Sequence, residues 1–173
     1  MPESHSMLFV TFDDPAAVRA AYAEVRELHG VRQAAVLERS ADGILDVPES
    51  WVHGAGTPTV VSGLLGGLVG LLGGPVGFFL GWTAGTVLGG ATEFKRFQDA
   101  AEGLTVFSSG LAEGESMLIV DLREESPDPV DAIAGRHGGR LVRRPAEEVE
   151  AEVRAAQRTA EDEVRKEQED AEG

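Results

Sequence analysis

The sequence predicts an α+β protein with a ferredoxin-like sheet, built from two βαβ halves that an apolar insertion separates. Two segments carry this prediction, one starting at Met7 and the other at Met117. Each reads as a run of strand formers, an Asp-Pro pair, a helical pattern and a second strand. Two such halves can form a four-stranded antiparallel sheet with two helices on one face.

The first half is expected over residues 1–48, with a strand at residues 7–10 and a helix after Asp14-Pro15. An Asp can accept a free backbone N–H at a helix start, and Pro has no N–H to lose there. Apolar residues then recur at spacings of three and four, which predicts one buried helical face. These residues are Val18, Ala21, Tyr22, Val25 and Leu28.

This helix is expected to stop at His29-Gly30, since Gly can take the left-handed conformation that ends many helices. A strand over residues 31–38 follows. A short extra strand at residues 44–47 is expected to form a hairpin with it.

The second half, residues 116–145, repeats this order in fewer residues. Its Asp128-Pro129 pair is expected to start a helix in the same way as the first pair. The returning strand is expected over residues 140–143.

The charge balance excludes nucleic acid as a partner. The chain has 30 acidic and 15 basic residues and a net charge of -15, whereas nucleic-acid affinity comes mainly from basic groups. There is no cysteine, so disulfides, thiolate zinc sites and cysteine nucleophiles are excluded as well.

The insertion, residues 49–115, contains the most unusual stretch of the chain. No Asp, Glu, Lys or Arg occurs from residue 50 to residue 92, although 26% of the chain is charged. Its glycines recur in steps of four, which places them on one stripe of a helix where another backbone can approach closely. The glycines predicted to lie at a helix-packing or membrane interface are Gly63, Gly66, Gly67, Gly70, Gly74, Gly77, Gly81, Gly85 and Gly89.

Gly73-Gly74-Pro75 interrupts this stretch and predicts a hairpin of two helices, residues 59–73 and 75–91. Glycine costs roughly 0.8–1.0 kcal/mol against Ala at each interior helix position, so an isolated hairpin in water is not stable. Each helix would be roughly 24 Å long, short of the ~30 Å hydrocarbon core. A thinned double span, a shallow re-entrant hairpin and a hairpin buried by the domain or by sister subunits therefore all stay open.

The flanks of the hairpin suggest an orientation. Lys95 and Arg96 follow it, which favours a cytoplasmic location for the folded domain. The first ten residues show no signal-peptide pattern, which agrees with that expectation. Trp51 precedes the hairpin and would lie either at headgroup depth or in ordinary domain packing.

Two further helices are expected after the hairpin. An amphipathic helix is predicted within residues 93–111. The segment 146–173 carries eleven acidic and four basic residues and predicts a solvated, acidic C-terminal helix, for which a short coiled-coil contact stays open.

No catalytic, cofactor or metal site is predicted. The four histidines are widely separated, and no phosphate-binding loop, dinucleotide fingerprint or nucleophile elbow occurs. Basic residues form the remaining candidates for contact with lipid headgroups or a phosphate. They are Lys95, Arg96, Arg136, Arg140, Arg143 and Arg144. The alternative is that the last four offset the acidic helix that follows them.

The chain resembles a widespread bacterial family of membrane proteins, the domain of unknown function numbered twelve sixty-nine. The resemblance spans residues 7–156 and rests on LLGGPVG at residues 71–77, GESMLIV at 114–120 and GGRLV at 138–142. It implies membrane association, a link to general stress proteins and no enzyme activity. The acidic tail beyond residue 157 departs from the family pattern.

We therefore expect a non-enzymatic protein of the cell membrane, with membrane lipids and further copies of itself as partners. Its glycine-zipper hairpin would insert in the bilayer and drive self-association. The alternative is a soluble homo-oligomeric module that binds a ligand or partner and buries the hairpin within the oligomer.

Overall fold

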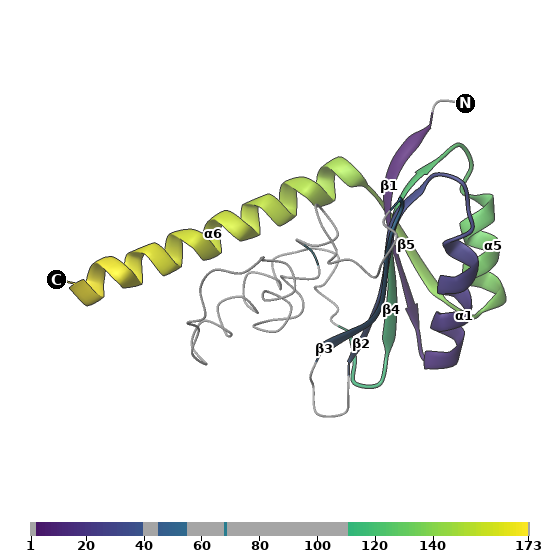
Figure 1. The fold of residues 1–173 in the computed structure, drawn as a ribbon, viewed down its shortest axis with the longest axis horizontal. Coiled ribbons are helices and arrows are strands. Elements are labelled where there is room, and N and C mark those ends of the chain that lie inside the picture. Colours follow the sequence, from purple (N-terminus) through teal and green to yellow (C-terminus); the bar gives the residue numbers. More distant parts are fainter. Residues whose placement is uncertain (1–2, 40–44, 55–67, 69–110, 173) are drawn as a thin grey trace.

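The computed structural model describes residues 3–39, 45–54, 68 and 111–172 of the chain. Within these residues, five strands form one antiparallel sheet in the order β3-β2-β4-β1-β5 (Figure 1). The strands are β1 (Ser4–Phe12), β2 (Val31–Arg39), β3 (Leu45–Val52), β4 (Ser116–Glu124) and β5 (Arg140–Pro145). The described helices are α1 (Pro15–Val25), α5 (Asp128–Arg136) and α6 (Ala146–Glu172). The predicted α+β class is confirmed.

Helix α1 begins and packs as its sequence predicts. Asp14 is the N-cap, and its Oδ1 accepts a hydrogen bond from the backbone N–H of Ala16 at 2.8 Å. The predicted face is buried from Val18 to Val25. The predicted helix end at His29-Gly30 is wrong, because α1 ends at Val25 and Leu28 lies in the turn that follows. Gly30 ends that turn with a φ of 86°, a left-handed conformation that glycine adopts without strain.

Helix α5 begins differently from the prediction. The proposed N-cap role of Asp128 is wrong, because Asp128 already lies in the first turn and Pro127 is the cap residue. The Ser126 hydroxyl accepts a hydrogen bond from the backbone N–H of Asp128 at 3.2 Å. A side chain can cap a helix only from outside its first turn, and Ser126 lies there, one residue before the cap residue Pro127.

Strand β3 continues to Val52, past the predicted boundary at residue 48. Trp51 pairs with Ala34 of β2 and packs against the core on the same face. This is the ordinary domain packing that the sequence left open for Trp51. Pairing with β2 continues to Val52, and Trp51 and Val52 point to opposite faces as successive strand residues do.

The main core lies between the sheet and the helix pair α1 and α5, which cover the same face (Figure 1). Leu8, Val10 and Phe12 of β1 are at most 1% exposed and lie at its centre. Gly139 passes close to them, since a Cβ atom there would lie 2.5 Å from Val10 Cγ1. Glycine therefore lets the start of β5 approach β1.

Helix α6 lies on the opposite side of the sheet and extends away from it (Figure 1). It is the acidic C-terminal helix predicted from the sequence. Its first turns pack against β1 and β5, where Ala146, Val149 and Val153 are buried. The sheet thus has described helices on both of its faces.

Candidate functional site

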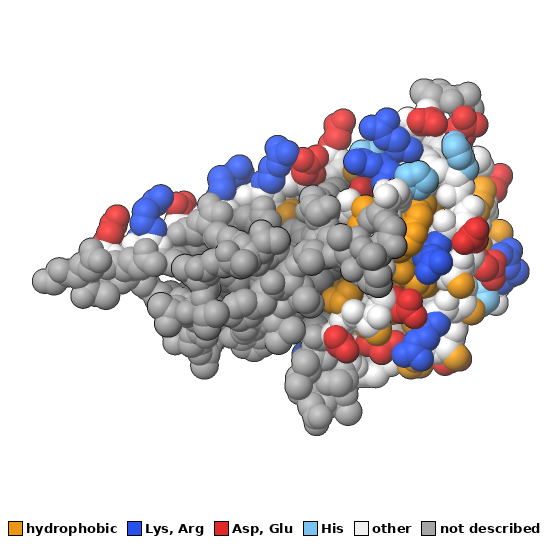
Figure 2. All heavy atoms as spheres, in the orientation of Figure 1, with side chains coloured by type: hydrophobic (Ala, Val, Ile, Leu, Met, Phe, Trp, Pro, Cys, Tyr) orange, Lys and Arg blue, Asp and Glu red, His pale blue; other side chains and the backbone are white. Residues whose placement is uncertain are grey.

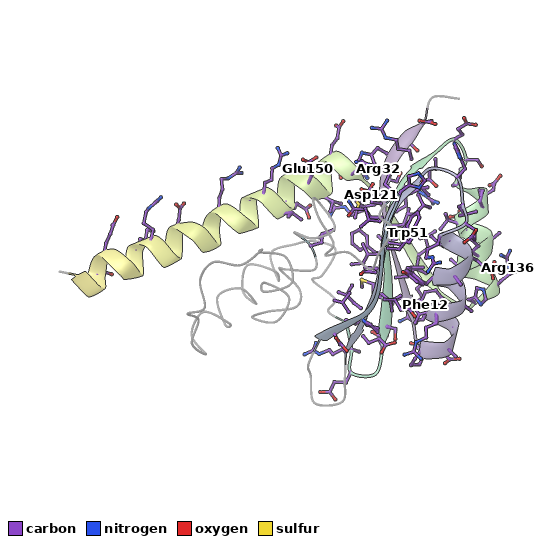
Figure 3. The ribbon with its side chains drawn as sticks, viewed as in Figure 1. Phe12, Arg32, Trp51, Asp121, Arg136 and Glu150 are labelled. Atoms are coloured by element: carbon purple, nitrogen blue, oxygen red, sulfur yellow. The ribbon has the colours of Figure 1, made fainter. Side chains whose placement is uncertain are left out.

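A buried aspartate joins three strands on the α6 side of the sheet. Asp121 of β4 is 3% exposed, and its Oδ1 lies 2.7 Å from Nε2 of His5 on β1. Arg32 of β2 places Nη1 3.8 Å from Asp121 Oδ2. Figure 3 labels Asp121 and Arg32 at the end of the sheet from which α6 starts. Figure 2 shows arginine and histidine side chains gathered at this end of the molecule.

The geometry assigns the proton on His5. An ionised carboxylate can only accept hydrogen bonds, so His5 Nε2–H donates to Asp121. The same nitrogen cannot also accept a bond from Arg32, although Arg32 Nη1 lies 3.3 Å away. Arg32 therefore acts on Asp121 as a nearby positive charge, and the Nδ1 atom of His5 keeps its own hydrogen-bonding capacity.

An irregularity in β2 brings Arg32 to this position. The register between β2 and β4 shifts between Val31 and Gln33, as in a β-bulge, which re-aims a side chain relative to regular pairing. Gln33 then pairs with Asp121, and its Oε1 is a buried oxygen without a hydrogen-bond partner within the described residues. The group is a charge-balanced polar cluster at the end of an apolar face.

This cluster could orient an imidazole for proton transfer, but within the described residues no group of His, Asp and Glu side chains could hold a metal ion. Sequence reasoning missed it. The signal was Asp121 itself, an acidic residue in the middle of the strand-forming run MLIVDL at residues 117–122. A charge at a buried strand position requires a partner from a neighbouring strand.

The rest of this side of the sheet is apolar, and we call it the second face. Its members alternate with the core-facing residues of β1, β2 and β4. They are Met7, Phe9, Ala35, Leu37, Met117 and Ile119. None of them is more than 7% exposed. The sheet therefore buries apolar side chains on both faces.

The predicted basic residues in the described part of the chain lie apart, each paired with carboxylates. Arg136 contacts Glu24 of α1, and Arg140 binds Asp13 and Glu115 at 3.2 and 2.6 Å. The hydrogen bonds that Arg140 donates to Asp13 are the main reason that the pKa of Arg140 is raised. The structure does not gather these side chains into one anion site.

Arg143 and Arg144 point to opposite faces of β5. Burial of Arg143 opposes its charge, but bonds to Glu124 at 2.7 Å and to Asp131 at 2.9 Å raise its pKa overall. Arg144 reaches Glu152 of α6 at 2.7 Å, which raises its pKa. Of the arginines predicted to offset the acidic helix, Arg144 is the one with a described contact to it.

Glu24 joins the ends of the two core helices. Its carboxylate contacts Arg136 and lies 2.7 Å from Nε2 of His137. The hydrogen bonds from His137 and Arg136 lower the pKa of Glu24. His137 follows the last residue of α5, so its contact with Glu24 joins the end of α5 to the end of α1.

The nine predicted glycines, Lys95 and Arg96 lie outside the described residues. Among the helices that the structure describes, none combines the length and the apolar character needed to cross a bilayer.

No family model matches the chain, and no curated protein or solved structure matches it either.

Proposed function

We propose that this chain is a membrane-associated bacterial protein without a catalytic role. Residues 59–91 would insert into the cell membrane as a glycine-zipper hairpin, with the folded domain on the cytoplasmic side. The observation that carries the proposal is the absence of Asp, Glu, Lys and Arg over residues 50–92 of a chain that is 26% charged. Four-residue glycine steps within that stretch favour contact with a second helix or a second copy.

We also propose that the domain is ferredoxin-like. The order β2-β4-β1-β5, with α1 and α5 together on one face, supports this assignment. Strand β3 would then be an addition at the edge beside β2. The family that the sequence resembles, and the stress-related role that this resemblance implies, stay predictions.

Cell fractionation tests the membrane proposal. The full chain and a variant lacking residues 59–91 are expressed in a bacterium, and the membranes are washed with alkaline carbonate. We expect the full chain to stay in the pellet until detergent is added and the deletion variant to be soluble. A matched control that lacks residues 157–172, part of the acidic helix, should stay in the pellet. A full chain that leaves the membrane in carbonate would refute insertion.

Self-association has a separate test. Chemical crosslinking of the membrane-bound chain is compared with that of a variant carrying Gly77→Leu and Gly81→Leu, which fills the glycine stripe. We expect the oligomer bands to collapse to monomer, because larger side chains keep the backbones apart. The control carries Val76→Leu and Phe79→Leu, which stay apolar and lie off the stripe. An unchanged ladder in the glycine variant would remove the zipper.

A second candidate is a soluble homo-oligomeric module that regulates or binds a partner and buries its hairpin in the oligomer. The apolar second face favours this candidate, because an apolar sheet face can pack against an apolar protein segment in place of lipid. A full chain recovered without detergent as a defined oligomer, and disrupted by deletion of residues 59–91, would select this candidate.

A further inference from the structure

The second face presents more apolar surface than the described helix on its side contacts. Helix α6 packs against β1 and β5. Ala35 and Leu37 of β2 and Met117 of β4 lie further across the sheet, and each is at most 7% exposed. Side chains buried to this extent, beyond the strands that α6 packs against, require a further apolar partner.

The chain leaves and rejoins the sheet at opposite ends of β2. On leaving, the backbone N–H of His53 donates to the carbonyl of Arg32 at 2.8 Å. On returning, Arg39 Nη1 donates to the carbonyl of Leu111 at 2.9 Å, and Leu111 is 8% exposed. Arg32 and Arg39 are separated by roughly 23 Å along an extended strand. The chain between His53 and Leu111 must therefore span the length of β2.

The composition of that connecting chain matches the face. Its part up to residue 92 has no Asp, Glu, Lys or Arg, so it brings no charge onto an apolar surface. Leu68, which belongs to this part, is fully buried. Asp121, at the end of the face, already has a cation nearby in Arg32 and a hydrogen-bond partner in His5. The face and the connecting chain are thus both apolar, as two surfaces that bury each other must be.

We propose that the second face is an intramolecular docking surface for the chain's own residues 59–91, occupied when no membrane is present. Docking keeps both apolar surfaces out of water. Transfer of the segment to a bilayer then replaces one apolar environment with another. This second step rests on the function proposed above. The occupant comes from the same chain, because the connecting chain is attached at both ends of β2, a strand that belongs to the face.

The methionines of this chain provide a probe for the proposal. The chain has three, and two of them, Met7 and Met117, belong to the second face. Full-length protein made by lipid-free cell-free synthesis with photo-methionine therefore carries photoreactive groups on this face without any substitution. After illumination and proteolysis, mass spectrometry identifies the crosslinked peptides. A mixture of isotopically heavy and light chains separates crosslinks within a chain from crosslinks between chains.

We expect crosslinks from Met7 and Met117 to peptides of residues 59–91, within single chains. The matched control moves each probe to the opposite face, with Met7→Leu plus Leu8→Met and Met117→Leu plus Leu118→Met. The moved probes should crosslink to α1 and α5, because Leu8 and Leu118 belong to the core on that side. Crosslinks to residues 59–91 from both sets, from neither set, or only between different chains would overturn the proposal. So would a chain that only precipitates without lipid.

Added phospholipid vesicles distinguish this inference from the proposed function. Loss of at least nine tenths of the crosslinks when the chain co-sediments with vesicles supports both. Persistent crosslinks without co-sedimentation support docking and refute membrane insertion. Co-sedimentation of a chain that gave no crosslinks before vesicles were added supports insertion and refutes docking.

Discussion

Replacement of Gly30 by alanine tests whether the close approach between the two halves exists in solution. Gly30 has a φ of 86°, and a Cβ atom there would lie 2.0 Å from the carbonyl oxygen of Arg123. The backbone N–H of Arg123 donates to the carbonyl of Gly30 at 2.9 Å, so the two backbones cannot separate without losing that bond.

The expected loss has two parts. A left-handed conformation costs a residue with a Cβ atom about 1–2 kcal/mol. Loss of the bond to Arg123 adds about 1 kcal/mol. We therefore expect Gly30→Ala to lower the free energy of unfolding by about 2–3 kcal/mol.

Gly138 provides a matched control, because it follows the other core helix with a φ of 70° and an added Cβ would meet nothing within 4 Å. Gly138→Ala should cost only the conformational part, about 1–2 kcal/mol. The entropy that alanine removes from the unfolded chain is the same in both variants and cancels in their difference.

Urea unfolding of the full chain, followed by circular dichroism, measures both variants. The comparison holds if the slope of unfolding free energy against urea is unchanged. Equal losses for the two variants would show that Gly30 and Arg123 do not meet as described.

Three other predictions concern the ion pairs and the core. Arg143→Met leaves Glu124, whose side chain is 6% exposed, without this cation. The free energy of unfolding in urea should fall by about 1–3 kcal/mol. Arg140→Met removes ion pairs of a more exposed arginine and should leave the free energy of unfolding nearly unchanged. Equal losses for the two variants would contradict the difference in burial. Because the pKa of Glu24 lies below its ordinary 4.5, its stabilisation is complete above that pH and is lost as pH falls through the folded-state pKa. The stability difference between wild type and Glu24→Gln, measured from pH 7 downward, should shrink below about pH 4.5, and a constant difference would count against the pairing. Gly139→Ala places a Cβ 2.5 Å from Val10 Cγ1 and should cost about 1–3 kcal/mol in thermal or urea unfolding. The loss caused by Gly139→Ala should be smaller in a chain that also carries Val10→Ala. An equal loss in both chains, which is simple additivity, would argue against the contact.

The local elements were predictable because their signals are short in sequence. Asp14-Pro15 and the apolar spacing after it identify α1, and the structure confirms both the cap and the buried face. The same pattern misassigned the cap of α5, because Ser126 sits close enough to the helix start to accept the hydrogen bond expected for Asp128. A residue pair can indicate a helix start, but the competing side chain nearby decides which group caps it.

The partners of charged residues were not predictable in the same way. Arg136, Arg140, Arg143 and Arg144 read as one basic patch, because they are neighbours in sequence. In the fold they face different elements, since successive strand residues point to opposite faces. The cluster of His5, Arg32 and Asp121 was missed for the converse reason, because strand pairing brings together residues more than a hundred positions apart.

The sequence alone determined the α+β class, the repeated strand and helix units, the acidic C-terminal helix and the long charge-free stretch, because each depends on residues close together in the chain. The tertiary structure decided which carboxylate pairs with which arginine, and that Trp51 packs against the core. It also decided that the sheet has a second apolar face with a buried aspartate at its end. Those features depend on strand order and register, which short-range patterns do not specify and long-range pairing does.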